Sequence, residues 1–209
     1  MKLILMGPVG SGKGTQAGLI AQEYNIPAIS TGEIFRTNIK NGTELGLMVK
    51  SYIDSGNLVP EEIVNKLVAD RLSQDDCKNG FILDGYPRNL NQAEELSKYM
   101  DIDIALMIDL SEEKIIQRLS SRRMCSKCAQ PTSLDWMVDG HCEKCGGEVY
   151  TRDDDKPEVI KNRLAKQAVP QELIEYYKLK GVFNKIDATD KVEDTFELVK
   201  SILNKVNND

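Results

Sequence analysis

The chain has 209 residues, 41% of them hydrophobic, so it can bury a sizeable core as one main domain with small insertions. Its formal net charge of −6 argues against a protein whose main activity is coating nucleic acid or anionic lipid, because such contacts require an excess of Lys and Arg. The first apolar run, LILM, is too short for a signal peptide or a membrane span, so we expect a cytoplasmic protein without a membrane partner.

Five short strand-like runs alternate with amphipathic helical patterns along the chain. They are KLILM at 2–6, PAI at 27–29, FILD at 81–84, IALMIDL at 104–110 and VFNKID at 182–187. Short, continuously apolar strands that alternate with helices indicate a parallel sheet covered on both faces, the α/β class. Ligands of such sheets bind at the carboxyl ends of the strands.

Helix signals support this alternation. Ser111 predicts the start of a helix after the fourth strand. Asp155, Pro157 and Glu158 predict an N-cap, a first-turn proline and a capping-box partner for a helix over 156–168.

Two stretches interrupt the alternation of strands and helices. Residues 30–59 are helical without a strand of their own, and residues 123–153 contain two cysteine pairs. We expect both to be small lobes inserted into a core formed by residues 1–29, 60–122 and 154–209.

A glycine-rich sequence, GPVGSGKGT at 7–15, follows the first strand and precedes a helical run. The spacing from its first glycine to Gly12 and Lys13 is that of a P-loop, whose backbone N–H groups surround nucleotide phosphates while the lysine supplies a charge. A plain strand-to-helix turn is the alternative. Gly14 replaces the usual Ser or Thr, and the hydroxyl arrives at Thr15. This G-K-G-T variant reduces the number of P-loop families to which the chain could belong.

Asp84 ends the third strand-like run, in GFILDGYPR. A carboxylate at a strand end is suited to holding Mg²⁺ through its water shell, as in other P-loop proteins. Taken alone, Asp84 could equally be a turn residue. Its occurrence with a P-loop favours the magnesium role.

Four of the five cysteines form two C-x-x-C pairs separated by 13 residues: Cys125, Cys128, Cys142 and Cys145. This spacing predicts a tetrahedral Zn²⁺ site, and four thiolates leave no open position, so the metal is expected to be structural. His141 is an alternative ligand. Trp136 is expected to fill the lobe's own apolar interior, and Cys77 to pack as a small apolar residue near a turn.

Four motifs in order, GPVGSGKGTQA, STGEIFR, GNLVPEEIV and GFILDGYPRNLNQA, resemble the adenylate kinase family, specifically its long form with a zinc-bearing lid. The resemblance covers essentially the whole chain. It implies a P-loop NTPase-type fold and direct transfer of a phosphoryl group from MgATP to AMP. It also implies a monomer, an AMP-binding lobe over 30–59 and a lid over 123–153 that closes over ATP.

The resemblance also implies roles for individual residues. Catalytic roles fall on Lys13, Asp84, Arg88, Arg122, Arg152 and Arg163. ATP-binding roles fall on Gly10, Ser11, Gly12, Lys13, Gly14, Thr15, Arg118 and Arg122. AMP-binding roles fall on Thr31, Arg36, Asn57, Leu58, Val59, Gly85, Arg88, Gln92, Arg152 and Arg163. Arginine suits these tasks because its planar fork binds phosphate oxygens in pairs and keeps its charge. No general base or covalent nucleophile is expected.

Other features depart from the family pattern or allow other interpretations. The lid segment AQPTSLDWMVDGH lacks the family's aromatic-His and Pro-Pro-Lys pattern, so strictness for ATP over GTP stays open. Asp154 and Asp155 match acidic residues at the lid hinge, and Arg123 is expected to be a solvated side chain.

Three other functions are suggested by parts of the sequence. A zinc ribbon that binds nucleic acid conflicts with the negative charge and the P-loop. A GTPase is suggested by N-K-x-D at 184–187, but we interpret this match as the end of the last strand. A kinase for another nucleoside monophosphate stays open, although Thr31 and Gln92 favour AMP.

Overall fold

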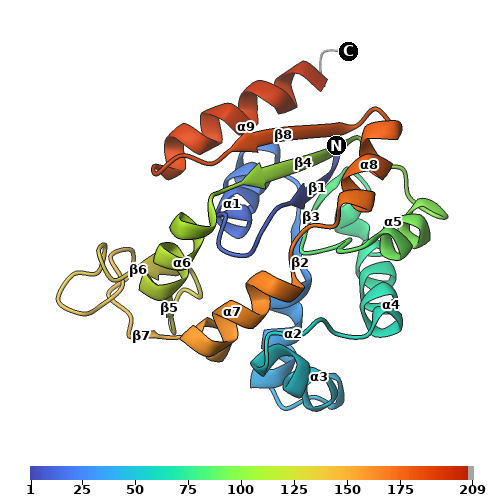
Figure 1. Cartoon of the computed structure of the whole chain (residues 1–209). Coiled ribbons are helices and arrows are strands. Elements are labelled where there is room, and N and C mark those ends of the chain that lie inside the picture. The colour runs from blue at the N-terminus through green and yellow to red at the C-terminus, as the bar shows by residue number, and fades with distance from the viewer. Residues whose placement is uncertain (207–209) are drawn as a thin grey trace.

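A five-stranded parallel sheet forms the centre of this computed structural model, which describes residues 1–206 (Figure 1). The spatial order is β2-β3-β1-β4-β8, with bounds Lys2–Met6 (β1), Ala28–Ser30 (β2), Phe81–Asp84 (β3), Ile104–Asp109 (β4) and Phe183–Asp187 (β8). All neighbours run parallel, so the carboxyl ends of the strands meet at one edge. The predicted α/β class and the five predicted strands are confirmed.

Alternate residues of each central strand pack into different cores. In β1, Ile4 and Met6 contact one apolar cluster, whereas Leu3 and Leu5 contact the other. Side chains of a strand point alternately to its two faces, so a strand covered on both sides must be apolar throughout. This requirement explains the unbroken run LILM.

Nine α-helices and two short 3₁₀ helices surround the sheet within residues 1–206. The α-helices are α1 (Lys13–Tyr24), α2 (Thr31–Lys40), α3 (Glu44–Asp54), α4 (Glu61–Leu72), α5 (Leu90–Ser97), α6 (Glu112–Ser121), α7 (Pro157–Lys166), α8 (Gln171–Leu179) and α9 (Val192–Val206), and the 3₁₀ helices are η1 (Asp75–Cys77) and η2 (Asp153–Asp155). Helices α1 and α9 supply one core, and α4, α5 and α8 supply the other. None of the helices in this part of the chain combines the length and the apolar character needed to cross a membrane.

The start of α7 corrects one prediction. Pro157 occupies the first turn, as expected, but the N-cap position is Lys156 and no side chain caps the helix. Asp155 instead lies in η2, where its carboxylate accepts hydrogen bonds from Arg122 and Arg163. Two guanidinium groups are stronger partners for a carboxylate than one backbone N–H, so the predicted capping role is wrong.

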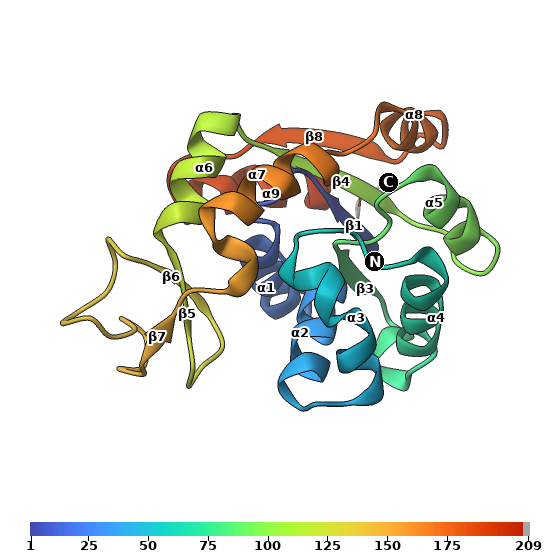
Figure 2. The ribbon, with the colours of Figure 1, turned by 60° about the horizontal axis from the view of Figure 1, so that its bottom comes forward.

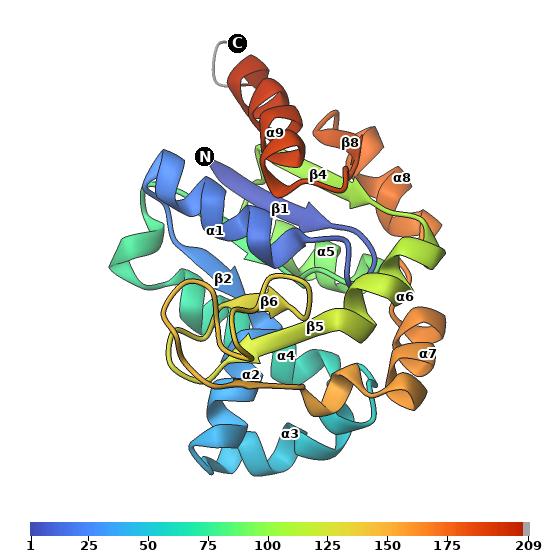
Figure 3. The same ribbon diagram turned by 90° about the vertical axis from the view of Figure 1, so that its left-hand side faces the viewer.

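The cysteine-containing insert folds as a small antiparallel sheet that the sequence did not predict. Its strands are β5 (Arg122–Cys125), β6 (Pro131–Ser133) and β7 (Val149–Tyr150), in the order β6-β5-β7. Figure 2 shows this sheet extending away from the central sheet, and Figure 3 shows β5 leaving directly from the end of α6. Trp136 is 53% exposed, so the prediction that it fills the interior of the insert is wrong.

Candidate active site and metal centre

The glycine-rich loop joins β1 to α1 at the carboxyl edge of the sheet. A Cβ at Gly7, whose φ is 135°, would lie 2.2 Å from the carbonyl oxygen of Ile108, so a side chain is excluded there. Gly12 is left-handed with φ 99° and precedes the first turn of α1. The ammonium of Lys13 donates to the carbonyl oxygens of Gly7 (2.9 Å) and Pro8 (2.8 Å). The loop therefore forms the open cradle that phosphate binding requires.

The environment of Lys13 is unusual for a lysine. Burial lowers the pKa of Lys13 to about 8, although the Asp84 carboxylate partly offsets this effect. The positive charges of Arg88, Arg163 and Arg122 lower the pKa further. These guanidinium groups thus converge on the same region as the lysine, an arrangement that would be costly without an anionic ligand.

Asp84 lies at the carboxyl end of β3, beside the first turn of α1. A Cβ at Gly14 would lie 3.5 Å from the Asp84 carboxylate, in ordinary van der Waals contact, so the carboxylate directly faces this position of the P-loop. A carboxylate here can hold the hydrated Mg²⁺ that accompanies a nucleotide on the P-loop.

A cavity opens beside the P-loop, between the central sheet and residues 30–59. It contains all the predicted AMP-binding residues except Arg152: Thr31, Arg36, Asn57, Leu58, Val59, Gly85, Arg88, Gln92 and Arg163. Apolar walls come from Phe35, Ile53 and Val64. The cavity thus combines flat apolar surfaces with several cations, which suits a nucleotide carrying phosphate groups.

Arg152 lies outside this lining but close to it. Its guanidinium is 3.7 Å from the Glu33 carboxylate, and its Nε is buried without a hydrogen-bond partner among residues 1–206. Burial lowers the pKa of Arg152 to about 10, and the charges of Arg36 and Arg122 lower it further. An anion at this position would relieve both the lost hydration and the repulsion.

Carboxylates hold three of the predicted arginines. Arg36 pairs with Glu33 at 3.0 Å. Arg122 and Arg163 share Asp155, at 2.7 Å and 2.9 Å respectively, and Arg163 also lies 3.2 Å from Asp154. Asp154 and Asp155 therefore contact these arginines.

Arg88 and Arg118 are held differently, by neutral oxygens. Arg88 donates to the Gly85 carbonyl (2.8 Å) and to the Gln167 side chain (2.9 Å). Arg118 donates to the Thr189 carbonyl (2.6 Å) and, at 3.5 Å, to the Ser11 carbonyl of the P-loop. Arg123, which was predicted to be solvated, is partly buried and donates to the backbone carbonyls of Ser120 and Arg122.

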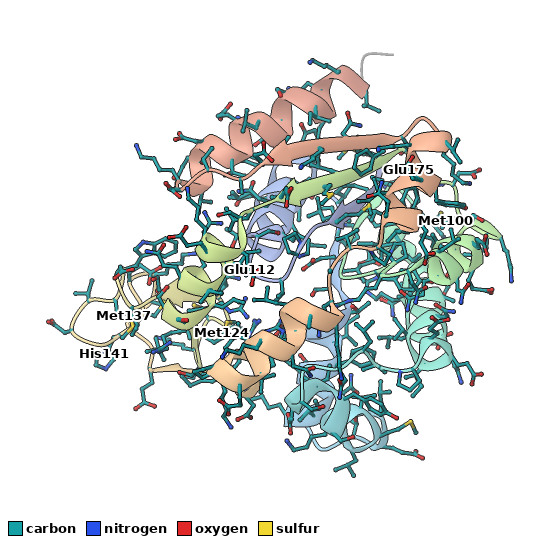
Figure 4. The ribbon with its side chains drawn as sticks, viewed as in Figure 1. Met100, Glu112, Met124, Met137, His141 and Glu175 are labelled. Atoms are coloured by element: carbon teal, nitrogen blue, oxygen red, sulfur yellow. The ribbon has the colours of Figure 1, made fainter. Side chains whose placement is uncertain are left out.

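The four predicted cysteine ligands come together in the insert. Their sulfur atoms all lie within 4.8 Å of one another, with 3.8 Å between Cys128 and Cys142. Tetrahedral Zn²⁺ with bonds of about 2.3 Å would separate its sulfur ligands by about 3.8 Å, so the donor set fits this metal. His141 is not part of this group and lies with Met137 on the outer part of the insert, whereas Met124 lies at its base (Figure 4).

Sequence reasoning missed Gln167. It lines the cavity and contacts Arg88, yet it belongs to none of the quoted motifs. A glutamine near the end of a helix gives no signal of its own, because its partners are distant in the sequence.

The fold and this site define a P-loop phosphotransferase of the nucleotide kinase class, in which a phosphate loop faces a second cavity for an acceptor. The chain belongs to the adenylate kinase family, whose model matches residues 5–182. It is 46% identical to an adenylate kinase of Clostridium acetobutylicum, over 99% of this chain and 100% of that protein. It is 48% identical to an adenylate kinase of Acetivibrio thermocellus, over 99% of each chain.

Proposed function

We propose that the protein catalyses reversible transfer of a phosphoryl group from MgATP to AMP, giving two molecules of ADP, as an adenylate kinase. The observation that supports this function best is the convergence of Arg88, Arg122 and Arg163 on Lys13, between the P-loop and the cavity. Phosphoryl transfer needs both nucleotides in line and fixed cations around the charge that develops on the transferred group.

The P-loop side is the proposed donor site. Backbone N–H groups from Gly10 to Thr15, including those of Ser11, Gly12 and Gly14, would surround the ATP phosphates together with the Lys13 ammonium. Arg118 and Arg122 would contact the donor from α6 and from the base of the insert. Mg²⁺ enters with ATP and neutralises part of its charge, and Asp84 would orient the hydrated ion.

The cavity is the proposed acceptor site. Thr31, Gln92 and the segment Asn57–Val59 would surround the AMP base and sugar, and Arg36, Arg88 and Arg163 would hold its phosphate. Arg152 would complete the set when the insert approaches. Because the acceptor phosphate is already ionised, these residues need only orient it and stabilise charge.

The division into domains is part of the proposal. Residues 30–59 form the AMP-binding lobe, residues 123–153 form the lid, and residues 1–29, 60–122 and 154–209 form the core. Zn²⁺ bound by Cys125, Cys128, Cys142 and Cys145 would hold the short lid strands together, with no role in the chemistry. The monomeric state, the cytoplasmic location and the absence of nucleic-acid partners remain predictions.

Phosphoryl transfer from MgATP to AMP, GMP, CMP and UMP tests this function. We expect AMP alone to be consumed, with two ADP formed per AMP. Consumption of another monophosphate in its place would overturn the assignment of the acceptor and leave the P-loop role intact. GTP in place of ATP is the matching test of the donor.

A further inference from the structure

The side chain of Gln167 joins two parts of the acceptor site. Its Nε2 donates to the carbonyl oxygen of Gly56 at 2.7 Å, and its Oε1 accepts from Arg88 Nη1 at 2.9 Å. The backbone N–H of Gln167 donates to the Arg163 carbonyl oxygen at the end of α7, which fixes the backbone from which the side chain extends. One amide thus bonds a loop of the 30–59 lobe through its nitrogen and a phosphate-site arginine through its oxygen.

These bonds determine how Arg88 faces the cavity. A guanidinium has five N–H donors. In Arg88, Nε donates to Gly85 and one Nη1 hydrogen donates to Gln167. The other three donors have no protein partner among residues 1–206, so they are available to an anion in the cavity. Two bonds on a planar group are enough to fix its plane, so Arg88 is oriented before the ligand arrives.

The partner that fixes Arg88 is neutral. Arg36, Arg122 and Arg163 each pair with a carboxylate, which competes with phosphate for the same donors. A side-chain amide orients the guanidinium while leaving its full charge for the ligand. The choice of Gln over Glu at position 167 therefore has a direct electrostatic consequence.

Three side chains on α7 and directly after it hydrogen-bond to three successive residues of the 30–59 lobe, 55–57. Asn162 donates to the Ser55 carbonyl, Lys166 donates to the Asn57 side chain at 2.8 Å, and Gln167 donates to Gly56. Among these three side chains, Gln167 alone also contacts Arg88. Gln167 therefore couples the position of the loop against α7 to the orientation of Arg88.

We propose that Gln167 is a positioning residue for the phosphoryl acceptor. It orients the uncompensated charge of Arg88 toward the acceptor phosphate and does so most firmly when the loop at Gly56 is seated on α7. This inference rests on the proposed function, because it assigns the cavity to AMP. It predicts that Gln167 affects the acceptor and the rate of transfer, without affecting the binding of MgATP.

The test is steady-state kinetics of Gln167→Met, with AMP varied at saturating MgATP and then MgATP varied at saturating AMP. Met has a similar length but makes neither bond. We expect kcat/KM for AMP to fall about 10- to 100-fold, with kcat lowered as well, and KM for MgATP to stay within about 2-fold of the wild type. Gln167→Glu keeps the length and the contact with Arg88, but it neutralises the charge and repels the Gly56 carbonyl, so it should lower kcat/KM for AMP at least as much.

Two further variants separate positioning from general loss of structure. Lys166→Met removes a bond to the loop without touching Arg88, so it should raise KM for AMP by a few-fold at most, with kcat unchanged. Gln171→Met is the matched control, because Gln171 is exposed and its side chain hydrogen-bonds to Glu175 on its own helix and to no other residue within 1–206.

Three outcomes would overturn the inference: a kcat/KM for AMP within about 2-fold of the wild type in Gln167→Met, an equal rise in KM for both nucleotides, or full activity in Gln167→Glu. The wild-type enzyme provides the separate test of the proposed function. If it uses a different monophosphate, the same comparison is made with that acceptor, so failure of one proposal is distinguishable from failure of the other.

Discussion

The cations of the site fall into two groups according to what holds them. Lys13, Arg88 and Arg118 are held by neutral oxygens, whereas Arg36, Arg122 and Arg163 are held by carboxylates. A phosphate can bind the first group without displacing another anion. The second group must exchange or share a carboxylate, so its members are better suited to contacts that form and break with each turnover.

The lowered pKa of Lys13 predicts a pH dependence of nucleotide binding. In the free enzyme Lys13 loses its proton as pH rises through about 8, whereas bound phosphates favour the charged form and raise its pKa. Binding should therefore take up a proton above this pH, and affinity should fall by up to about 10-fold per unit between pH 8 and 10. Calorimetry with a non-hydrolysable ATP analogue, in buffers of different ionisation enthalpy, measures both quantities.

Lys13→Met is the control for this pH dependence. It should bind the analogue weakly, with an affinity that changes little over the same range. A wild-type affinity that is flat from pH 7.5 to about 9.5 would show that Lys13 keeps its proton in the free enzyme and would refute the prediction.

At the scale of elements, we expect the proposed lid to depend on its cysteines because it has little else to hold it. Its strands contain two to four residues, and Leu134, Trp136 and Val138 are all substantially exposed. Because the proposed lid buries so little apolar surface, we expect a metal at the four cysteines to supply most of its stability.

Replacement of one cysteine tests this dependence. In Cys142→Ser the bound zinc should fall well below one per chain and the lid should become sensitive to proteolysis, while the core still unfolds cooperatively. Metal analysis and limited proteolysis measure these effects. Cys77→Ser is the control, because Cys77 is buried in the main core, outside the sulfur cluster, and should leave the metal in place. Full metal content in Cys142→Ser would show that the ligand set is wrong.

The loop at Gly56 offers a second test at this scale. Gly56 has φ 71°, and a Cβ there would lie 2.7 Å from Arg163 Cγ and 2.9 Å from Val159 Cγ1. Gly56→Ala should therefore push the loop away from α7, raise KM for AMP and lower stability by about 1–3 kcal/mol. Kinetics and urea unfolding measure the two effects.

Gly42→Ala is the matched control for Gly56→Ala. Gly42 has a similar φ of 64°, but a Cβ there would meet open space. It should lower stability through backbone strain alone, by about 1 kcal/mol, without changing KM for AMP. Equal effects of the two variants on KM would mean that the contact with α7 does not matter.

The central strands could be predicted from the sequence because each is an unbroken apolar run bounded by turns. The strands of the lid could not, because runs as short as Val149–Tyr150 carry no periodicity and are held by pairing alone. The capping role of Asp155 was wrong for a related reason. A local motif was overruled by an arginine 33 residues earlier in the sequence.

At the scale of the whole molecule, two adjacent carboxylates connect the three parts of the chain. Asp155 pairs with Arg122 at the base of the lid and with Arg163 on α7. Asp154 also pairs with Arg163 and lies 4.0 Å from Arg36 in the 30–59 lobe. These contacts link β5, α7 and the 30–59 lobe to one another.

Asp155→Asn tests the contribution of this network to stability. Asp155 is 4% exposed, so loss of its charge leaves the buried Arg163 and the partly buried Arg122 without their shared partner. We expect the free energy of unfolding to fall by about 2–3 kcal/mol in urea titrations, because Arg163 keeps Asp154 as a second partner. Asp153→Asn is the control, because Asp153 is largely exposed and pairs with Lys156, so its change should stay below about 0.5 kcal/mol. Equal stability of the two variants would mean that the network adds nothing to the fold.

The candidate site was predictable wherever its residues lie in local motifs, as in the P-loop and the cysteine pairs. Gln167 was not, because its two partners lie 79 and 111 residues away and the bonds exist only in the folded chain. Gln167 thus joins segments of the chain that no single motif spans.

The exposed Trp136 has a practical consequence. It is the only tryptophan in the chain, so intrinsic indole fluorescence comes from the proposed lid alone. Because about half of its surface meets solvent, its emission should respond to whatever covers or uncovers the lid. The unmodified enzyme therefore carries its own optical reporter in the proposed lid.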